Sequence, residues 1–347
     1  MKARMSVSIM ILSMIACVLL SGNDTVAEYW PTEGWQTSPP ETQNMNSEQL
    51  KQINEYVREK LPDTTSVLVV RNGYIVFEEY YQREKGDLRD LVGATKSITS
   101  ALIGIAIQEN YIAGVDEKMI SFFPEFDSEA LYPQVREITI RHLLTMTAGF
   151  GPDVMGLAFP DKIQRMLESP LKSEPGQEFA FNSTACNILS MIITKTTGLM
   201  AEEFGEEYLF EPLGISNFEW SDMILFTFGH QGLRLTTQDM AKIGYLYLNE
   251  GMWDGSQIIP KEWIVESTKK QIEVFDTEQW IGDGFGYQWW TLSVNGHSAY
   301  IAWGFDGQHI CVIPDLDMVI AITGGGGGFT KKYLQIINNF ILPSVME

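Results

Sequence analysis

Residues that bind transition metals are scarce in this chain. Its 347 residues include 3 cysteines and 4 histidines, and their spacing matches no metal-binding pattern. Cys186 and Cys311 follow the N-terminal apolar run, and each lies in an apolar stretch. They could pair in one disulfide or stay buried as free thiols, and the sequence leaves both open. We therefore expect no metal centre and no cofactor.

Basic residues are also scarce. Lysine and arginine number 24 against 45 acidic residues, which gives a formal net charge of −21. Nucleic acids and anionic membrane surfaces are bound by clustered positive charge, so the composition argues against both as partners. With 45% hydrophobic residues the chain can fill one large core or two closely packed subdomains. The composition predicts a globular protein with an acidic surface and does not predict its oligomeric state.

The N-terminus has the layout of a secretory signal peptide. Met1–Arg4 is short and basic, Met5–Leu20 is apolar, and Ser21–Ala27 is small and polar. This pattern predicts cleavage after residue 27 and export, to the medium, the periplasm or the cell surface. An uncleaved membrane anchor formed by residues 5–20 is the alternative, since that run is only slightly short of a spanning helix.

The chain after the leader begins with an extended lead segment, residues 28–45, that carries several aromatic residues. Asn46 and Gln49 then predict a capped helix that runs to about Lys60. The dipeptide Asn72-Gly73 predicts a hairpin between two strands, Ser66–Val70 and Tyr74–Tyr81. The chain thus opens as helix, strand, strand.

Strands return near the C-terminus, and helices fill the middle. The predicted strands are Tyr287–Val294, Ala299–Trp303, Gln308–Ile313 and Met318–Thr323, and a last helix spans Lys331–Leu342. The predicted helices between them are Gly93–Ile107, Ile140–Met146, Ile188–Thr197 and Gly232–Leu248. This order predicts an α+β domain over 46–343, with a sheet subdomain (46–92 and 285–343) and a helical subdomain (93–284). The glycine run 324–328 is expected to be a flexible turn.

The helix that begins at Gly93 carries the candidate site. Ile98, Leu102 and Ile105 recur at helical spacing, so Lys96 lies about one turn inside a buried helix. In a Ser-x-x-Lys site, three residues of helix place a hydroxyl and an amine on one face, close enough for proton transfer. Here the serine position is Gly93. The scaffold of a nucleophile site is present without the nucleophile.

Five segments, in this order, resemble one known family. They are Ala94-Thr95-Lys96-Ser97, His142-Leu143-Leu144-Thr145-Met146-Thr147, Pro175-Gly176 leading to Phe181, Thr237-Gln238-Asp239-Met240-Ala241-Lys242, and Trp303-Gly304 with Gly307-Gln308. From about Trp30 to Ile341 the chain resembles the serine β-lactamase-like family, which includes class C β-lactamases, penicillin-binding carboxypeptidases and related esterases. The resemblance implies an antiparallel sheet with helices on both sides, an all-helical subdomain, and an active site in the seam between them.

The resemblance also assigns roles to residues. It implies that Lys96 is the retained lysine of Ser-x-x-Lys and that Gly93 stands at the nucleophile position. It places Phe181 where a tyrosine hydroxyl relays protons, with Ser183 two residues later. The third motif is Trp303-Gly304-Phe305, in an esterase-like form, and its backbone N–H with that of residue 93 would form an oxyanion hole.

Two hydroxyl groups are therefore missing at the positions that carry the chemistry. Loss of the nucleophile in a comparable serine hydrolase lowers turnover about a million-fold. We expect an exported binding or scaffold protein whose seam holds a small ester, amide or peptide ligand. The alternative is an active esterase or amidase that uses Lys96-activated water or an unrecognised nucleophile, and a third possibility is a stable relative with no ligand.

Other candidate residues are expected to be structural. Ser97 and Thr95 should point away from the Lys96 face of their helix, so neither replaces the missing serine. His142 is expected to be a structural histidine within its helix, and Asp239 a cap or a first-turn charge.

Overall fold

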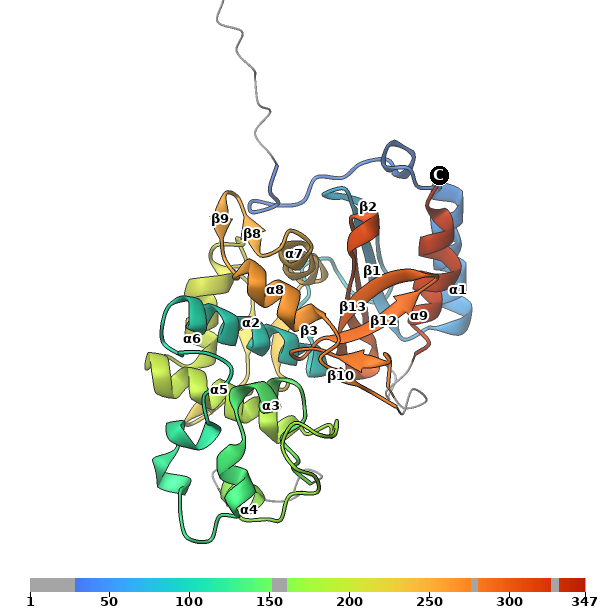
Figure 1. Cartoon of the computed structure of the whole chain (residues 1–347). Helices are drawn as coiled ribbons and strands as arrows, with labels where there is room; N and C mark the ends of the chain where they lie inside the picture. The colour runs from blue at the N-terminus through green and yellow to red at the C-terminus, as the bar shows by residue number, and fades with distance from the viewer. Residues whose placement is uncertain (1–28, 152–160, 276–279, 326–330, 347) are drawn as a thin grey trace, which may run out of the picture.

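The computed structural model describes residues 29–151, 161–275, 280–325 and 331–346. A half that contains the large sheet lies beside a half built mainly of helices (Figure 1). The sheet is eight-stranded and antiparallel throughout. Its strands are, in spatial order, β10 (Ile272–Glu273), β11 (Gly284–Phe285), β12 (Trp290–Val294), β13 (His297–Gly304), β14 (Gln308–Ile313), β15 (Met318–Gly324), β1 (Thr64–Arg71) and β2 (Tyr74–Tyr80).

The two ends of the chain complete this one sheet, as the sequence pattern predicts. The β1–β2 hairpin turns at Asn72 and Gly73, whose φ angles of 49° and 80° both lie in the left-handed region that such a turn requires. On its other side β1 pairs with β15, with Val67 opposite Ile322. The predicted α+β fold is confirmed.

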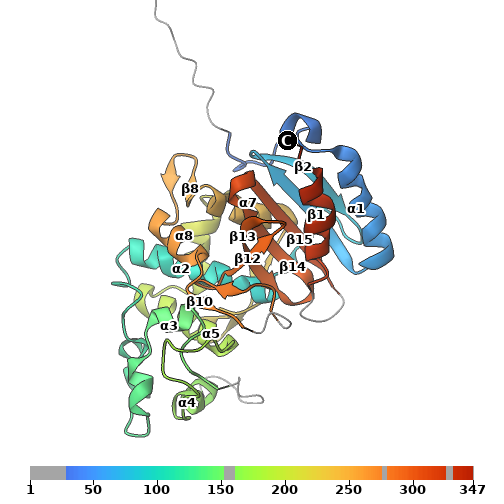
Figure 2. The same ribbon diagram turned by 45° about the vertical axis from the view of Figure 1, so that its right-hand side comes forward.

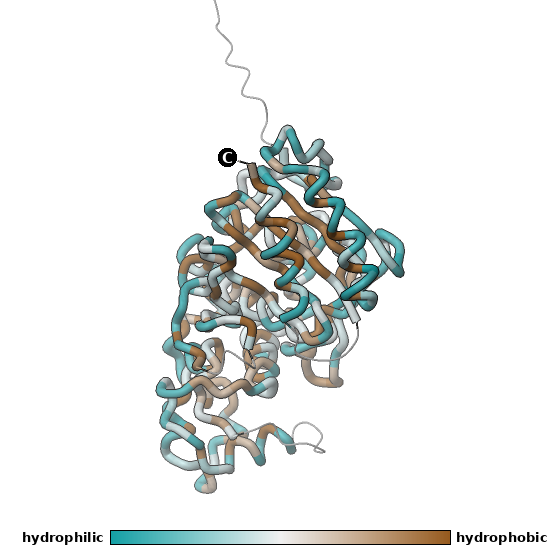
Figure 3. The backbone as a smooth tube through the Cα atoms, turned by 90° about the vertical axis from the view of Figure 1, so that its right-hand side faces the viewer, coloured by the Kyte–Doolittle hydropathy of each residue, from teal (hydrophilic) through white to brown (hydrophobic). Residues whose placement is uncertain are grey.

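Helices cover both faces of the sheet (Figure 2). On one face lie α1 (Ser47–Lys60) and the C-terminal helix, which begins as α9 (Leu334–Ile336) and continues through wider and tighter turns to Ser344. The C-terminal helix thus starts at Leu334 rather than at the predicted Lys331. Figure 3, which colours each residue by hydropathy, shows hydrophilic residues along these helices and hydrophobic residues along the strands beneath them.

The start of α1 follows the predicted capping signal in part. The Asn46 side chain accepts a hydrogen bond from the Gln49 backbone N–H at 2.9 Å, while the Gln49 side chain instead donates to the Asn339 carbonyl. The inner face of α1 buries Leu50, Ile53 and Val57. Each such apolar side chain stabilises the fold by about 1.5–3 kcal/mol.

On the opposite face, α7 (Thr237–Leu248) packs against β1, β14 and β15. Gly244 lets this helix approach closely, because a β-carbon there would lie 2.4 Å from the Val319 side chain. The predicted helix Gly232–Leu248 was wrong over its first residues. Leu233–Leu235 form strand β7, which pairs with β3 (Arg89–Asp90) and β4 (Glu219–Trp220), so these partners satisfy its backbone groups.

The first turn of α7 contains a small buried polar group. Thr236 caps the helix by accepting a hydrogen bond from the Asp239 backbone N–H at 3.1 Å. The Asp239 carboxylate lies 3.5 Å from the Lys242 amine. Burial raises the pKa of Asp239, and its contacts with Thr236 and Lys242 oppose that shift. The predicted role of Asp239 as a first-turn charge agrees with this arrangement.

The helical half is built around two long buried helices, α2 (Thr95–Gln108) and α5 (Ser183–Thr197). α5 starts at Ser183 rather than at the predicted Ile188, because the Asn182 side chain caps it by accepting a hydrogen bond from the Ala185 N–H. The remaining α-helices are α3 (Ile140–Leu144), α4 (Asp161–Leu167), α6 (Ala201–Gly205) and α8 (Lys261–Thr268), and the remaining strands form the pairs β5 (Asp222–Met223) with β6 (Phe226–Thr227) and β8 (Met252–Trp253) with β9 (Ser256–Gln257).

The predicted limit between the two subdomains needs correction. The sheet begins at Ile272, before the predicted boundary at 285, because β10 and β11 extend it at the edge. α7, which lies inside the range 93–284, also packs on the sheet. The strand predicted from Tyr287 starts at Trp290, since Gln288 has a φ of 66° that breaks the extended backbone.

The lead segment is held by aromatic contacts. The rings of Trp30 and Trp35 lie 5.7 and 5.5 Å from that of Tyr245 in α7. The Trp253 indole N–H donates to the Thr32 hydroxyl at 2.8 Å. A short 3₁₀ turn at Pro40–Gln43 then leads into α1.

Two predictions concern segments outside the described residues in whole or in part. The leader, 1–27, lies outside them, and so does most of the glycine run 324–328. None of the described helices combines the length and the apolar character that crossing a bilayer requires. Cys186 and Cys311 are both buried and neither is in a disulfide, so of the two open alternatives the structure has the thiols.

Candidate active site

A cavity of about 160 Å³ opens where the starts of α2 and α5 meet the end of β13. Six of the seven predicted site residues line it, and four residues that the sequence analysis did not single out, Val92, His230, Gln231 and Trp290, join them. The full lining is Val92, Gly93, Lys96, Phe181, Ser183, His230, Gln231, Trp290, Trp303 and Phe305. Gly304, the seventh predicted residue, does not line the cavity. It packs closely against the segment before α2, since a β-carbon on Gly304 would lie 2.2 Å from the Leu91 carbonyl oxygen.

The backbone turns sharply just before α2. Val92 has a φ of 46°, which is unfavourable for a β-branched residue, and its N–H donates to the Asp90 carboxylate at 2.7 Å. A short 3₁₀ turn, Val92–Ala94, then carries the chain into the helix. The strained residue thus immediately precedes the glycine at the predicted nucleophile position.

The direction of an added side chain at Gly93 can be read from the backbone. A β-carbon built there would lie 3.5 Å from the Lys96 amine, so a side chain at this position would point toward that lysine. The same carbon would lie 2.9 Å from the Trp303 carbonyl oxygen and 3.4 Å from the Gly304 α-carbon. Strand β13 therefore crowds the place that a β-carbon would occupy.

Lys96 is buried, with 6% of its surface exposed, and its amine makes contacts of different kinds. It donates a hydrogen bond to the His230 carbonyl oxygen at 3.2 Å. It also lies 5.0 Å from the centre of the Phe181 ring, within the range of a cation–π contact. The face of a phenylalanine thus lies where the predicted relay needs a hydroxyl.

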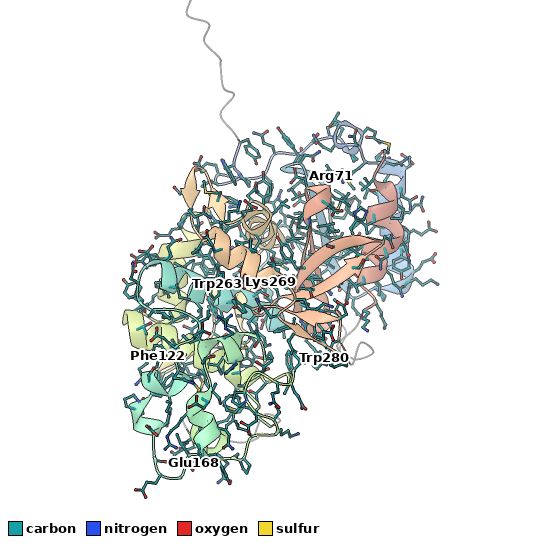
Figure 4. The ribbon with its side chains drawn as sticks, viewed as in Figure 1. Arg71, Phe122, Glu168, Trp263, Lys269 and Trp280 are labelled. Carbon is teal, nitrogen blue, oxygen red and sulfur yellow. The ribbon has the colours of Figure 1, made fainter. Side chains whose placement is uncertain are left out.

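Indole rings form one wall of the cavity, and a further indole ring packs behind that wall. Trp280 stacks on Phe181 at 4.9 Å and on Trp290 at 5.4 Å, and the edge of Trp303 meets Trp290 at 5.7 Å. Trp280 lies at the edge where the sheet meets the helical half (Figure 4). Among the described residues that line the cavity none is acidic. The site therefore combines one amine with an aromatic surface.

His230 has a defined tautomer. The Asn187 side-chain oxygen accepts the Gly229 backbone N–H at 3.0 Å, which fixes the orientation of that amide. The same oxygen lies 2.9 Å from Nδ1 of His230, so Nδ1 must carry a proton and donate. In the neutral ring the lone pair is then on Nε2.

The other candidate residues lie outside the cavity lining. Ser97 is buried and its hydroxyl donates to the Gln288 carbonyl at 2.7 Å, and Thr95 is fully buried. Nδ1 of His142 accepts the Thr139 N–H at 3.2 Å, which makes it part of the cap of α3. Burial lowers the pKa of His142. The structural role predicted for His142 agrees with this geometry.

No group of three or more His, Cys, Asp or Glu side chains in the described part of the chain could hold a metal ion. The chemistry that the cavity offers is that of an amine, an imidazole, a serine hydroxyl and the backbone of residues 93 and 305. Such groups can bind a carbonyl or amide compound. The oxyanion hole inferred from the sequence stays a prediction.

Comparisons with known proteins agree with this fold. The model of the beta-lactamase family matches residues 53–330. An uncharacterized protein of Alkalihalophilus pseudofirmus is 25% identical over 57% of this chain, and the 6-aminohexanoate-dimer hydrolase of Paenarthrobacter ureafaciens is 23% identical over 76%. The matches span 62% and 74% of those two proteins.

Solved structures show the same fold. The octameric penicillin-binding protein homologue from Pyrococcus abyssi superposes with a TM-score of 0.70 at 19% identity, over 87% of this chain and 78% of that one. At this identity the likeness concerns the fold alone. The match of the family model covers most of the chain, and the antiparallel sheet with its covering helices agrees with it, so the chain belongs to the beta-lactamase family of serine hydrolases.

Proposed function

We propose that this chain is a relative of the serine hydrolases that binds a small carbonyl compound in the seam cavity and turns it over very little or not at all. One observation carries the proposal. A side chain at position 93 would point at the Lys96 amine, yet position 93 is a glycine and the ring over that amine is a phenylalanine. The scaffold for acyl transfer is kept, while the two hydroxyl groups that it would use are missing.

The ligand class follows from the lining of the cavity. A volume of about 160 Å³ is close to that of a cavity that holds benzene, so the enclosed group has roughly six to eight heavy atoms. Aromatic walls favour an apolar or aromatic group, and the Lys96 amine favours a carbonyl or carboxylate oxygen. Esters, amides and short peptides have these features. The signal-peptide pattern of residues 1–27 supports the further proposal that the protein is exported.

Restoration of the missing groups tests the proposal. The double variant Gly93→Ser with Phe181→Tyr supplies both hydroxyls, and Gly93→Ala with Phe181→Tyr is its matched control, because it adds the same β-carbon without the nucleophilic oxygen. We expect the serine variant to hydrolyse p-nitrophenyl esters at least about a hundredfold faster than the alanine control. This gain is smaller than the roughly million-fold loss of turnover that follows removal of the nucleophile in a comparable serine hydrolase, because β13 must move before the serine fits.

Two outcomes contradict the proposal. A folded serine variant that is no faster than its alanine control means that position 93 is not the nucleophile position. Ester turnover by the unmodified protein that disappears in Lys96→Ala means that the chain is an active hydrolase in which Lys96 activates water. Circular dichroism and thermal melting of every variant show that the comparison is made between folded proteins.

A further inference from the structure

Gln288 has a backbone conformation that is unfavourable for a residue with a side chain. It lies two residues before β12, its φ is 66°, and it is buried, with 3% of its surface exposed. Glycine adopts this left-handed conformation readily, whereas a residue with a β-carbon is strained in it. Strain at a buried residue points to a role for the side chain that glycine could not fill.

The side-chain amide of Gln288 joins two helices of the helical half. Its Nε2 donates to the carbonyl oxygens of Leu143 and Leu144, at 3.0 and 2.8 Å. These carbonyls lie at the C-terminal end of α3, where a helix leaves carbonyl groups without a partner of its own. The Oε1 of the same amide accepts the thiol of Cys186, in the first turn of α5, at 3.3 Å. One side chain thus holds the end of α3 beside the start of α5.

The backbone of Gln288 joins these helices to α2 and to the sheet. Its N–H donates to the Leu144 carbonyl at 3.1 Å, and its carbonyl accepts the Ser97 hydroxyl at 2.7 Å. Ser97 directly follows Lys96 on α2. Trp290, at the start of β12, lines the seam cavity, as Lys96 does. Gln288 therefore contacts or directly precedes several of the elements that surround the cavity.

The end of α3 in turn holds the segment that carries Phe181. The Met146 carbonyl, two residues beyond α3, accepts the Ala180 N–H at 2.8 Å. The Met146 sulfur accepts the Asn182 N–H at 3.5 Å. These two N–H groups flank Phe181 on both sides, so the position of α3 fixes the backbone that places this ring in the cavity wall.

We infer that Gln288 is a positioning residue for the seam cavity, whose side chain ties the ends of α3 and α5 to the sheet and holds the helical half closed against it. Without this tie the seam should open locally where Cys186 lies, while the sheet stays folded. The inference needs no ligand and so goes beyond the proposed function.

The variant Gln288→Gly removes the side-chain tie alone. Glycine accepts a φ of 66° without strain and keeps the backbone hydrogen bonds to Leu144 and Ser97, so we expect this variant to fold. Glu250→Gly is the matched control, because it makes the same kind of change at a φ of 53° in the turn after α7, outside the cavity lining. Circular dichroism and thermal melting check the fold of both.

The reaction of the buried thiols in the folded protein measures the opening. Each full-length protein is incubated with methyl methanethiosulfonate, and peptide mass spectrometry follows Cys186 and Cys311 separately, with Cys311 in β14 as the internal control. We expect Cys186 to react at least about tenfold faster in Gln288→Gly than in the unmodified protein and in Glu250→Gly. An equal rate at Cys186, or a parallel rise at Cys311, overturns the inference.

Amide hydrogen exchange separates local opening from a void that merely admits the reagent to Cys186. The N–H groups of Ala180 and Asn182 bond to Met146 and do not touch Gln288. If the tie holds the seam, both should exchange faster in Gln288→Gly than in the unmodified protein. Unchanged exchange at both positions contradicts the inference even if Cys186 reacts.

A kinetic measurement relates the tie to the chemistry of the site. In the restored variant Gly93→Ser with Phe181→Tyr, added Gln288→Gly should lower kcat for p-nitrophenyl esters at least about tenfold, because the reacting groups are held less precisely. Added Glu250→Gly should leave kcat unchanged, and an unchanged kcat with Gln288→Gly overturns the inference. A restored variant without activity contradicts the proposed function alone, since the thiol and exchange measurements still decide on Gln288.

Discussion

His309 makes the stability of the fold sensitive to acid. It lies on β14, it is fully buried, and its ring is 5.5 Å from that of Tyr333 in the segment before α9. Burial lowers the pKa of His309 from the ordinary 6.5 to about 4, and the Gly307 carbonyl offsets this only in part. The folded protein therefore holds this imidazole neutral under conditions where the unfolded chain protonates it.

The size and the sign of the effect follow from proton linkage. A tenfold change in proton affinity corresponds to about 1.4 kcal/mol, so the lowered pKa gives about 3 kcal/mol in total. Between pH 6.5 and about 4 the His309 imidazole takes up a proton in the unfolded chain but stays neutral in the folded chain. The contribution of His309 to the free energy of unfolding is complete above pH 6.5, and it is lost as the pH falls toward 4.

The assay is urea denaturation between pH 7 and pH 4. His309→Leu removes the titrating ring, so its free energy of unfolding should fall by about 3 kcal/mol less than that of the unmodified protein over this range. Cys311→Ala is the matched control, because Cys311 lies on the same face of β14 and burial raises the pKa of its thiol to about 12. The control should be less stable at every pH with an unchanged pH dependence. Equal pH dependence in His309→Leu and the unmodified protein would refute the argument.

Two further predictions concern local stability and the thiols. Asn46→Ala removes the cap of α1 and should lower the free energy of unfolding by about 1 kcal/mol, measured by urea denaturation; a change within error would mean that the cap contributes nothing. In protein produced without residues 1–28, Cys186 and Cys311 should not react with a thiol reagent while folded and should give two equivalents in guanidinium; zero equivalents would indicate a disulfide.

Short-range sequence signals predicted the parts of the fold that depend on interactions between residues close together in the sequence. Asn72-Gly73 set the hairpin because both φ angles are positive there, and Asn46 marked the start of α1 through one short-range hydrogen bond. The strand β7 was predicted as helix because its apolar residues directly precede the helix α7, and because one of its partners, β3, is distant in sequence.

The candidate site also contains some residues that local motifs predict and others that they do not. Gly93, Lys96 and Phe181 were predicted because they stand at fixed spacings within motifs, and the structure places all three around one cavity. His230 and Trp290 have no local signal, since only the packing of α2, α5 and the sheet brings them there. The pair Asn187 and His230 could have been noticed only with the fold in hand.

The closeness of β13 to Gly93 bears on how this protein changes over generations. If an ancestor carried serine at this position, its replacement by glycine allowed the Trp303 carbonyl to settle where a β-carbon would now be 2.9 Å away. A change back to serine would then require strand β13 to move before the new side chain fits. On that premise the return to serine requires a backbone shift that its loss did not, so the structure would favour keeping the glycine.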